Sequence, residues 1–125
     1  MDKLTREEMV AEFGETGVQN PMVIDLISLD RASDTVVLVM IERRPWGVAG
    51  EQIKQIEEKL NRYMGYVLDG FLAEQYPQYV GKPVQIRLDC AEAPHGEAVR
   101  FVAAMTDACE RHGIHCTTAV LPPVS

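Results

Sequence analysis

The sequence has little of what several classes of protein require. It contains three cysteines, an odd number without the spacing of a disulfide framework, which indicates a reducing compartment. No apolar run approaches the roughly 18 residues that a transmembrane helix needs. Residues 1–8 are too acidic and polar for a secretory signal peptide. These deficits predict a cytoplasmic protein that does not enter a membrane.

Positive charge is also scarce. Lys and Arg number 12 against 19 Asp and Glu, which gives a net charge of −7. Because binding to nucleic acids and to anionic membranes depends on Lys and Arg, this balance argues against both partners. It is compatible with a basic protein partner, and equally with a charge that only keeps the protein soluble.

Familiar catalytic motifs are missing as well. The chain contains no glycine-rich phosphate loop, no G-x-S-x-G or H-E-x-x-H motif and no EF-hand loop. Their absence favours a protein without enzymatic activity and without a cofactor. It does not exclude a small enzyme with an unfamiliar site.

The length of 125 residues suits one domain. Residues 5–8, TREE, fit a capping box and predict a short helix to about residue 13. We therefore divide the chain into an N-terminal helix with its linker, residues 1–20, and a single α+β domain, residues 21–125.

The most apolar part of the chain is a predicted hairpin, with strands over residues 22–29 and 35–42. Its second strand, TVVLVMIE, is apolar on both faces, so both faces need cover. Helices would cover one face, and the N-terminal helix or a second copy of the chain would cover the other. The surplus apolar face favours a homodimer.

Two amphipathic helices and two more strands follow. Apolar spacings of three and four predict helices over residues 50–75 and 97–112, with Lys59 among the polar residues opposite the apolar face of the first. Strands are predicted over residues 84–90 and 114–120. The predicted fold is α+β: a hairpin and two β-α-β crossovers form a four-stranded mixed sheet, on which both long helices pack.

The corner after the second strand is the best candidate for a contact site. Arg43, Arg44 and Trp46 belong to the residue types most enriched at interaction hot spots. The alternative is that Trp46 plugs the end of the sheet while its ring N–H finds a backbone carbonyl.

Two further places are candidates for a ligand site or a general base. Asp25 lies among apolar neighbours and could act as a base if it is buried and unpaired; alternatively it faces water or pairs with Arg87. Asp89, Cys90 and His95 collect an acid, a thiol and an imidazole. Alternation along the strand turns Cys90 toward the core, which favours inert packing.

The C-terminal region carries the one set of residue types that suggests a metal. Cys109, His112, His115 and Cys116 are all side chains that zinc favours. However, Gly113 ends the helix, and neighbours in a strand point to opposite faces, so the four cannot converge without distortion. We therefore predict no metal site, with this set as the weak candidate.

Several segments carry a resemblance. They are VIDLI at 23–27, VVL at 36–38, Pro45-Trp46, QIEEKLNRY at 55–63, Asp69-Gly70, Tyr76-Pro77 and GKPV at 81–84. With them the chain resembles, over roughly residues 21–120, a family of small uncharacterised bacterial proteins. The resemblance implies a bacterial cytoplasmic protein and lends no catalytic residues. It does not include the C-terminal Cys/His set.

We expect a non-enzymatic domain that acts by protein–protein contact, as a homodimer. A sharper version is an acidic inhibitor or immunity-type protein that masks a basic partner. The alternative is a small enzyme or ligand-binding protein with a site at the strand ends, near Asp25, Arg43, Trp46, Asp89 and His95.

Overall fold

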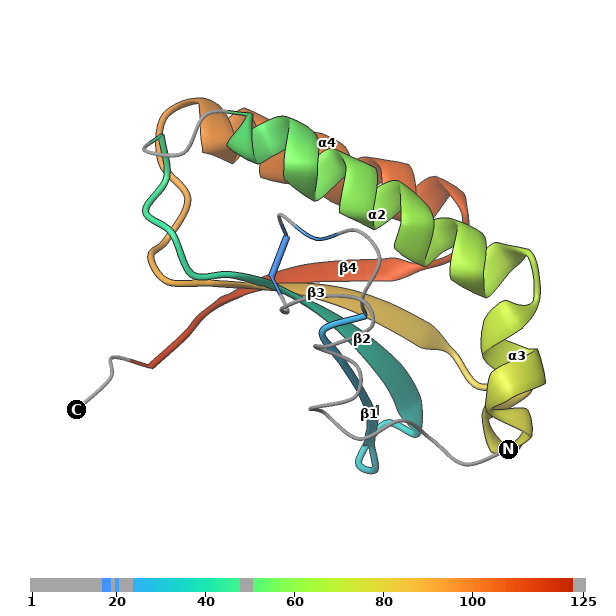
Figure 1. Cartoon of the computed structure of the whole chain (residues 1–125). Coiled ribbons are helices and arrows are strands. Elements are labelled where there is room, and N and C mark those ends of the chain that lie inside the picture. The colour runs from blue at the N-terminus through green and yellow to red at the C-terminus, as the bar shows by residue number, and fades with distance from the viewer. Residues whose placement is uncertain (1–16, 19, 21–23, 48–50, 123–125) are drawn as a thin grey trace.

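A mixed sheet forms the centre of the computed structural model, which describes residues 17–18, 20, 24–47 and 51–122 (Figure 1). The strands are β1 (Leu26–Asp30), β2 (Thr35–Glu42), β3 (Val84–Cys90) and β4 (His115–Val120). The four strands lie in the order β1-β2-β3-β4. β1 and β2 are antiparallel, and β2, β3 and β4 are parallel to one another. The predicted helix over residues 5–13 lies outside the described residues.

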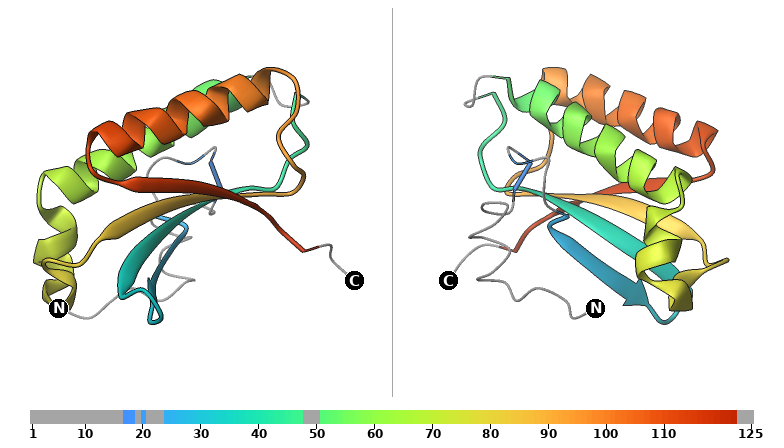
Figure 2. Two further views of the ribbon diagram at one scale, coloured as in Figure 1. Left: turned by 180° about the vertical axis from the view of Figure 1, so that it is seen from behind. Right: turned by 45° about the vertical axis from the view of Figure 1, so that its right-hand side comes forward.

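Two long helices cover one face of this sheet. α2 (Gln52–Leu68) connects β2 to β3, and α4 (Glu97–Arg111) connects β3 to β4. They lie side by side over the same face in every view (Figures 1 and 2). The predicted α+β fold with two β-α-β crossovers is therefore confirmed. In the described ranges, no helix has the length and apolar character to cross a membrane.

The predicted helix over residues 50–75 is wrong in its length. The structure divides it into α2 and a short helix α3 (Phe71–Gln75), and a 3-10 turn, η1 (Pro77–Tyr79), follows. Gly70 separates α2 from α3 with a φ of 89°. This left-handed conformation suits glycine because glycine has no Cβ, so the chain can change direction here.

The core lies between the sheet and the two long helices. The register of β2 and β3 sets Leu38 beside Ile86 and Met40 beside Leu88. All four side chains are fully buried. The helices add the buried residues Ile56, Leu60, Tyr63, Ala98, Met105 and Cys109.

β2 is buried on both faces within a single chain. Val37 and Val39, which alternate with the core residues of β2, are 4% and 0% exposed. A second copy is therefore not needed to cover this strand. The apolar character of β2 no longer supports a homodimer, and a dimer has to be argued from another surface.

β1 begins at Leu26, later than the predicted start at residue 22. The backbone of Ile41 in β2 explains the late start. Its N–H donates to Oδ2 of Asp25 (2.8 Å), and its carbonyl accepts from the Val18 N–H (2.9 Å). A side chain and a separate segment thus occupy the hydrogen-bonding groups that a longer β1 would have used.

Candidate functional site

Glu42, the last residue of β2, is buried and binds Arg44. Its Oε1 accepts from the backbone N–H of Arg44 (2.8 Å) and from Nε (2.9 Å), while Oε2 accepts from Nη2 (2.7 Å). Nη2 also donates to Oε1 of Gln55 in α2 (2.8 Å). Hydrogen bonding to Glu42 raises the pKa of Arg44. Arg44 therefore ties the end of β2 to α2.

Trp46 is buried and joins this corner to the loop between β3 and α4. Its backbone N–H donates to Oε1 of Glu92 (2.8 Å), and its ring N–H donates to the Glu92 carbonyl (2.9 Å). Nε2 of His95 lies 3.1 Å from the same Oε1. The Trp46 N–H, and then His95, lower the pKa of Glu92. The corner thus has the geometry of a tryptophan that plugs the end of the sheet.

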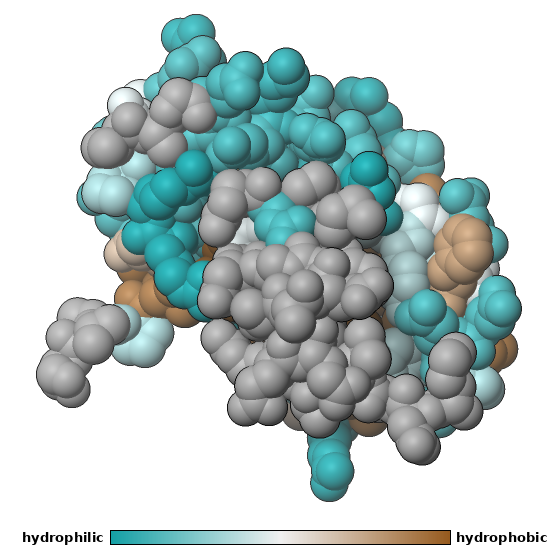
Figure 3. Space-filling view, viewed as in Figure 1, coloured by the Kyte–Doolittle hydropathy of each residue, from teal (hydrophilic) through white to brown (hydrophobic). Residues whose placement is uncertain are grey.

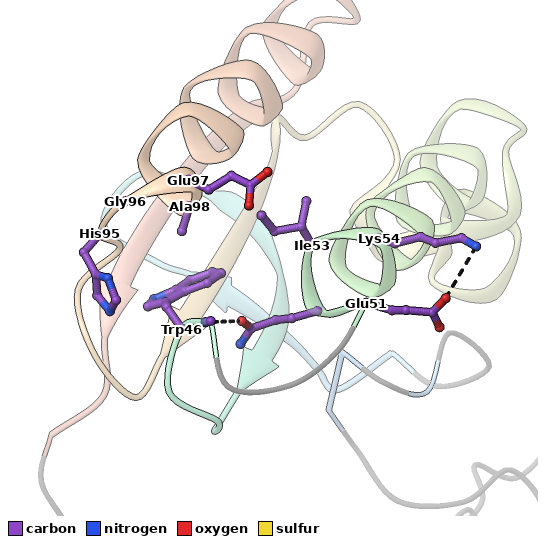
Figure 4. A pocket seen from close by; sticks show the side chains of 10 residues that line it. Trp46, Glu51, Ile53, Lys54, His95, Gly96, Glu97 and Ala98 are labelled. Atoms are coloured by element: carbon purple, nitrogen blue, oxygen red, sulfur yellow. Dashed lines mark hydrogen bonds and ion pairs between the residues drawn. The ribbon is translucent and has the colours of Figure 1, made fainter.

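A groove of about 420 Å³ lies beside Trp46, at the carboxyl ends of β2 and β3 (Figure 4). It opens between the first turns of α2 and α4, which contribute Ile53 and Ala98. Its charged lining residues are of both signs: Glu51, Lys54 and Glu97. In sheets with parallel strands, ligands commonly bind outside the carboxyl ends of the strands. The groove has room for a small ligand, but His95, the imidazole in its lining, is already bonded to Glu92.

Asp25 forms a buried ion pair with Lys59 of α2. Lys59 Nζ lies 2.6 Å from Oδ1 of Asp25, and both side chains are 0% exposed. Nζ also donates to the Gly17 carbonyl (2.7 Å), and the Gly17 N–H donates to Oδ1 of Asp25 (2.8 Å). Burial lowers the pKa of Lys59, and hydrogen bonding to Asp25 opposes that shift. Asp25 pairs with Lys59 and not with Arg87.

Tyr63 completes this network one turn further along α2. Its hydroxyl donates to the Val39 carbonyl (2.8 Å) and accepts from the Asp25 N–H (2.8 Å). Burial raises the pKa of Tyr63, so the hydroxyl stays protonated. Among the described residues, both carboxylate oxygens and the N–H of Asp25, the Lys59 ammonium and the Tyr63 hydroxyl thus all have partners, so Asp25 is not an unpaired carboxylate.

The role of Lys59 was not predicted from the sequence. Its residue type predicted a place on the polar face of the helix, whereas the side chain is fully buried. Its position gave a usable signal: Lys59 lies three residues after Ile56 and four before Tyr63, which is the spacing of the buried stripe. A buried lysine on that stripe requires a buried acid, and Asp25 is that acid.

Asp89, Cys90 and His95 do not come together. Arg87 binds Asp89 (Nε to Oδ1, 2.7 Å), and hydrogen bonding to Asp89 raises the pKa of Arg87. Cys90 alternates with Asp89 and is fully buried on the helix side, where burial raises the pKa of its thiol to about 12. His95 is exposed and bonded to Glu92. The acid, the thiol and the imidazole therefore belong to three different surroundings.

The C-terminal Cys/His set is also divided. Cys109 and Cys116 are buried as free thiols, whereas His112 and His115 are exposed. The two thiols are mutual neighbours: hydrogen bonding between them lowers the pKa of Cys109 and raises that of Cys116. Across the described ranges, no group of three or more His, Cys, Asp and Glu residues could hold a metal ion.

Comparison with known proteins gives a family without an assigned role. A family model described as a family of unknown function (DUF6572) matches residues 16–122. No significant match was found among curated proteins or among solved structures.

Proposed function

The chain belongs to this family of unknown function, and we propose that it is a non-enzymatic protein-interaction domain whose contact site is the open edge of β4. β4 is the last strand of the sheet. In the described part of the chain, no strand pairs with the side of β4 that faces away from β3. Figure 2 (left), which views the molecule from behind, has no described segment along this edge.

The composition of β4 is the observation that carries the proposal. The strand reads HCTTAV, without a proline and without a Lys, Arg, Asp or Glu. Edge strands are normally protected from pairing by charges, prolines or bulges. An edge without these devices has backbone N–H and C=O groups that can bind an additional strand by β-augmentation.

Four carboxylates near the strand ends support a non-enzymatic role, because each already has a partner. Asp25, Glu42, Asp89 and Glu92 each bind a partner inside the chain. General acid–base chemistry requires a group that is positioned to exchange a proton with substrate. Asp25 and Glu92 instead join distant segments of the chain, and Asp89 binds Arg87 on its own strand.

The net charge of −7 favours a basic surface on any foreign partner. A domain that offers an edge strand and an acidic surface would suit an inhibitor or immunity-type role against a basic protein. The three free thiols are compatible with a reducing, cytoplasmic location.

The test is affinity capture from the native host with three forms of the chain. Val120→Lys places a charge at the end of β4, where the side chain is 53% exposed, and Val80→Lys makes the same change at a remote valine that is 64% exposed. A protein retained by the wild type and by Val80→Lys, but lost with Val120→Lys, supports the proposal. Retention of the same proteins by all three forms would show that β4 is not the contact site.

A second candidate is a ligand-binding protein that uses the groove beside Trp46. The position of the groove at the strand ends favours it. Trp46 is the single tryptophan of the chain, so its fluorescence reports on the groove directly. A set of small amines and carboxylates that leaves the emission of Trp46 unchanged at millimolar concentration would count against this candidate.

A further inference from the structure

We propose that the occupant of the β4 edge is a second copy of the chain, bound antiparallel about a two-fold axis at Thr118, so that two four-stranded sheets become one continuous sheet. The inference rests on the proposed function, because it names the partner of the same edge. Four observations support it: the direction of the backbone groups, the register that symmetry allows, an unpartnered hydroxyl, and the distribution of charge and apolar surface.

The backbone groups that point to the open edge belong to Cys116, Thr118 and Val120. The Leu121 N–H donates to the Cys90 carbonyl of β3 (2.7 Å), so the backbone groups of Leu121 face β3. Because a parallel strand alternates the direction of its groups, those of Thr117 and Ala119 also face β3. The even-numbered residues in between face outward. Pro122, the next even-numbered residue, has no N–H and ends the set.

Symmetry restricts the register to a few choices. Two copies related by a two-fold axis perpendicular to the sheet keep their helices on the same face, so opposed residues must point to the same face. The axis must then pass through a residue of β4. An axis at Thr118 opposes Thr118 to its own copy and Cys116 to Val120, which pairs all three outward-facing residues.

The Thr118 hydroxyl favours this register. Its Oγ1 is the one buried side-chain polar atom without a hydrogen-bond partner among the described residues. A buried polar group without a partner costs free energy. With the axis at Thr118, the two copies of this threonine lie directly opposite each other. Thr118 as a whole is half-buried, so rotation about χ1 can turn its hydroxyl from the interior toward the opposed threonine, where a cross-strand hydrogen bond forms.

The composition of β4 limits the electrostatic cost of pairing two copies. Each chain carries a charge of −7, so two copies repel each other overall, but β4 contains no Lys, Arg, Asp or Glu, and pairing through it places no like charges directly opposite each other. Val99 on α4 and Val120 at the end of β4 are both 53% exposed. The helical spacing places Val99 on the same flank as Thr106, which interacts with Cys116 of β4. β1, at the other end of the sheet, finishes instead on the exposed Asp30.

Light scattering coupled to size exclusion tests the proposal on the whole chain. We expect the wild type and Val80→Lys to be dimers at micromolar concentration, and Val120→Lys to be a monomer with an unchanged circular dichroism spectrum. Val99→Lys should also disrupt the dimer, through α4 instead of β4, and serves as the second variant in case Val120→Lys does not fold. A monomeric wild type up to about 100 µM would overturn the inference, and so would dimers that persist in both Val120→Lys and Val99→Lys.

Thr118→Val tests the register, because it should weaken the dimer without weakening the monomer. The monomer should become no less stable to urea, since an unpartnered hydroxyl is removed. The dimer should dissociate roughly two- to five-fold more readily, since a cross-strand hydrogen bond is lost. An unchanged dissociation constant would overturn the axis at Thr118. A wild-type monomer that still captures another protein through β4 would remove the second copy as occupant and leave the proposed function standing.

Discussion

Replacing Asp25 with asparagine removes one charge from the buried pair and leaves Lys59 without its counter-charge inside the fold. Both side chains are 0% exposed and lie 2.6 Å apart, so solvent cannot compensate the loss. Breaking such a pair by removing one partner costs about 3–5 kcal/mol. Domains of this size have about 5–15 kcal/mol of stability in total. Asp25→Asn should therefore lose about a fifth or more of the free energy of unfolding.

Urea denaturation followed by the fluorescence of Trp46 measures this loss. With a slope of about 1–3 kcal/mol per molar urea, the midpoint should fall by at least about 1 M. The control is Asp89→Asn, which breaks a pair whose Arg87 and Asp89 side chains are 35% and 12% exposed. Because water reaches Arg87, this substitution should cost less than Asp25→Asn.

The double variant Asp25→Asn, Lys59→Met separates the ion pair from the other contacts of Asp25. It removes both charges and keeps a long apolar side chain at position 59, so it should be more stable than Asp25→Asn alone. A cost below about 1 kcal/mol for Asp25→Asn would refute the buried pair. So would a double variant that is less stable than the single one.

Three further predictions concern Gly65 in α2 and Gly70 after it, a buried thiol, and the corner at Trp46. Gly65→Ala should raise the free energy of unfolding by about 0.5–1 kcal/mol, because Gly65 is helical and an added Cβ meets nothing closer than 3.7 Å. Gly70→Ala should lower it by about 1 kcal/mol, because its φ is 89°; equal urea midpoints for the two variants would contradict this. Burial raises the pKa of Cys90 from about 9 to about 12, so the unfolded thiol ionises first and stability should fall as the pH rises from about 9 to 12. In urea titrations at pH 8 and pH 10, Cys90→Ala should show a smaller fall than the wild type. Trp46→Phe should cost about 1 kcal/mol or more in thermal melts, because it loses the bond to the Glu92 carbonyl as well as packing; no change would mean that the bond is not formed.

Periodicity predicted the sheet and the long helices because each of these elements buries one face. The predicted bounds of β2 and β3 are confirmed to the residue, since strong alternation or a continuous apolar run leaves one choice. The start of β1 could not be predicted in this way. It depends on the hydrogen bond from Ile41 to Asp25, a contact between distant residues that no local pattern encodes.

The network around Asp25 could be predicted only in part. The pattern marked Asp25 as an acid among apolar residues, but its partner lies 34 positions away on another element. Lys59 was assigned by its residue type to the polar face, although its helical position belonged to the buried stripe. The position on the helix was the better guide, because a lysine with a buried acid nearby can be held inside the core.

No side-chain pattern in the sequence marks the β4 edge as a contact site, because the groups that would bind there belong to the backbone. The candidate residues that the sequence offered, such as Asp25, Trp46 and His95, bind partners within the same chain. In HCTTAV, the sequence marked only His115 and Cys116, as members of the weak metal set, and gave no reason to select the strand as a contact site. Only the strand order shows that this uncharged segment is the last strand. The strand order therefore identifies β4 as the candidate for contact with another protein. Its outward backbone groups have no strand partner among the described residues and no charged side chain protects them, and such groups favour pairing with a further strand.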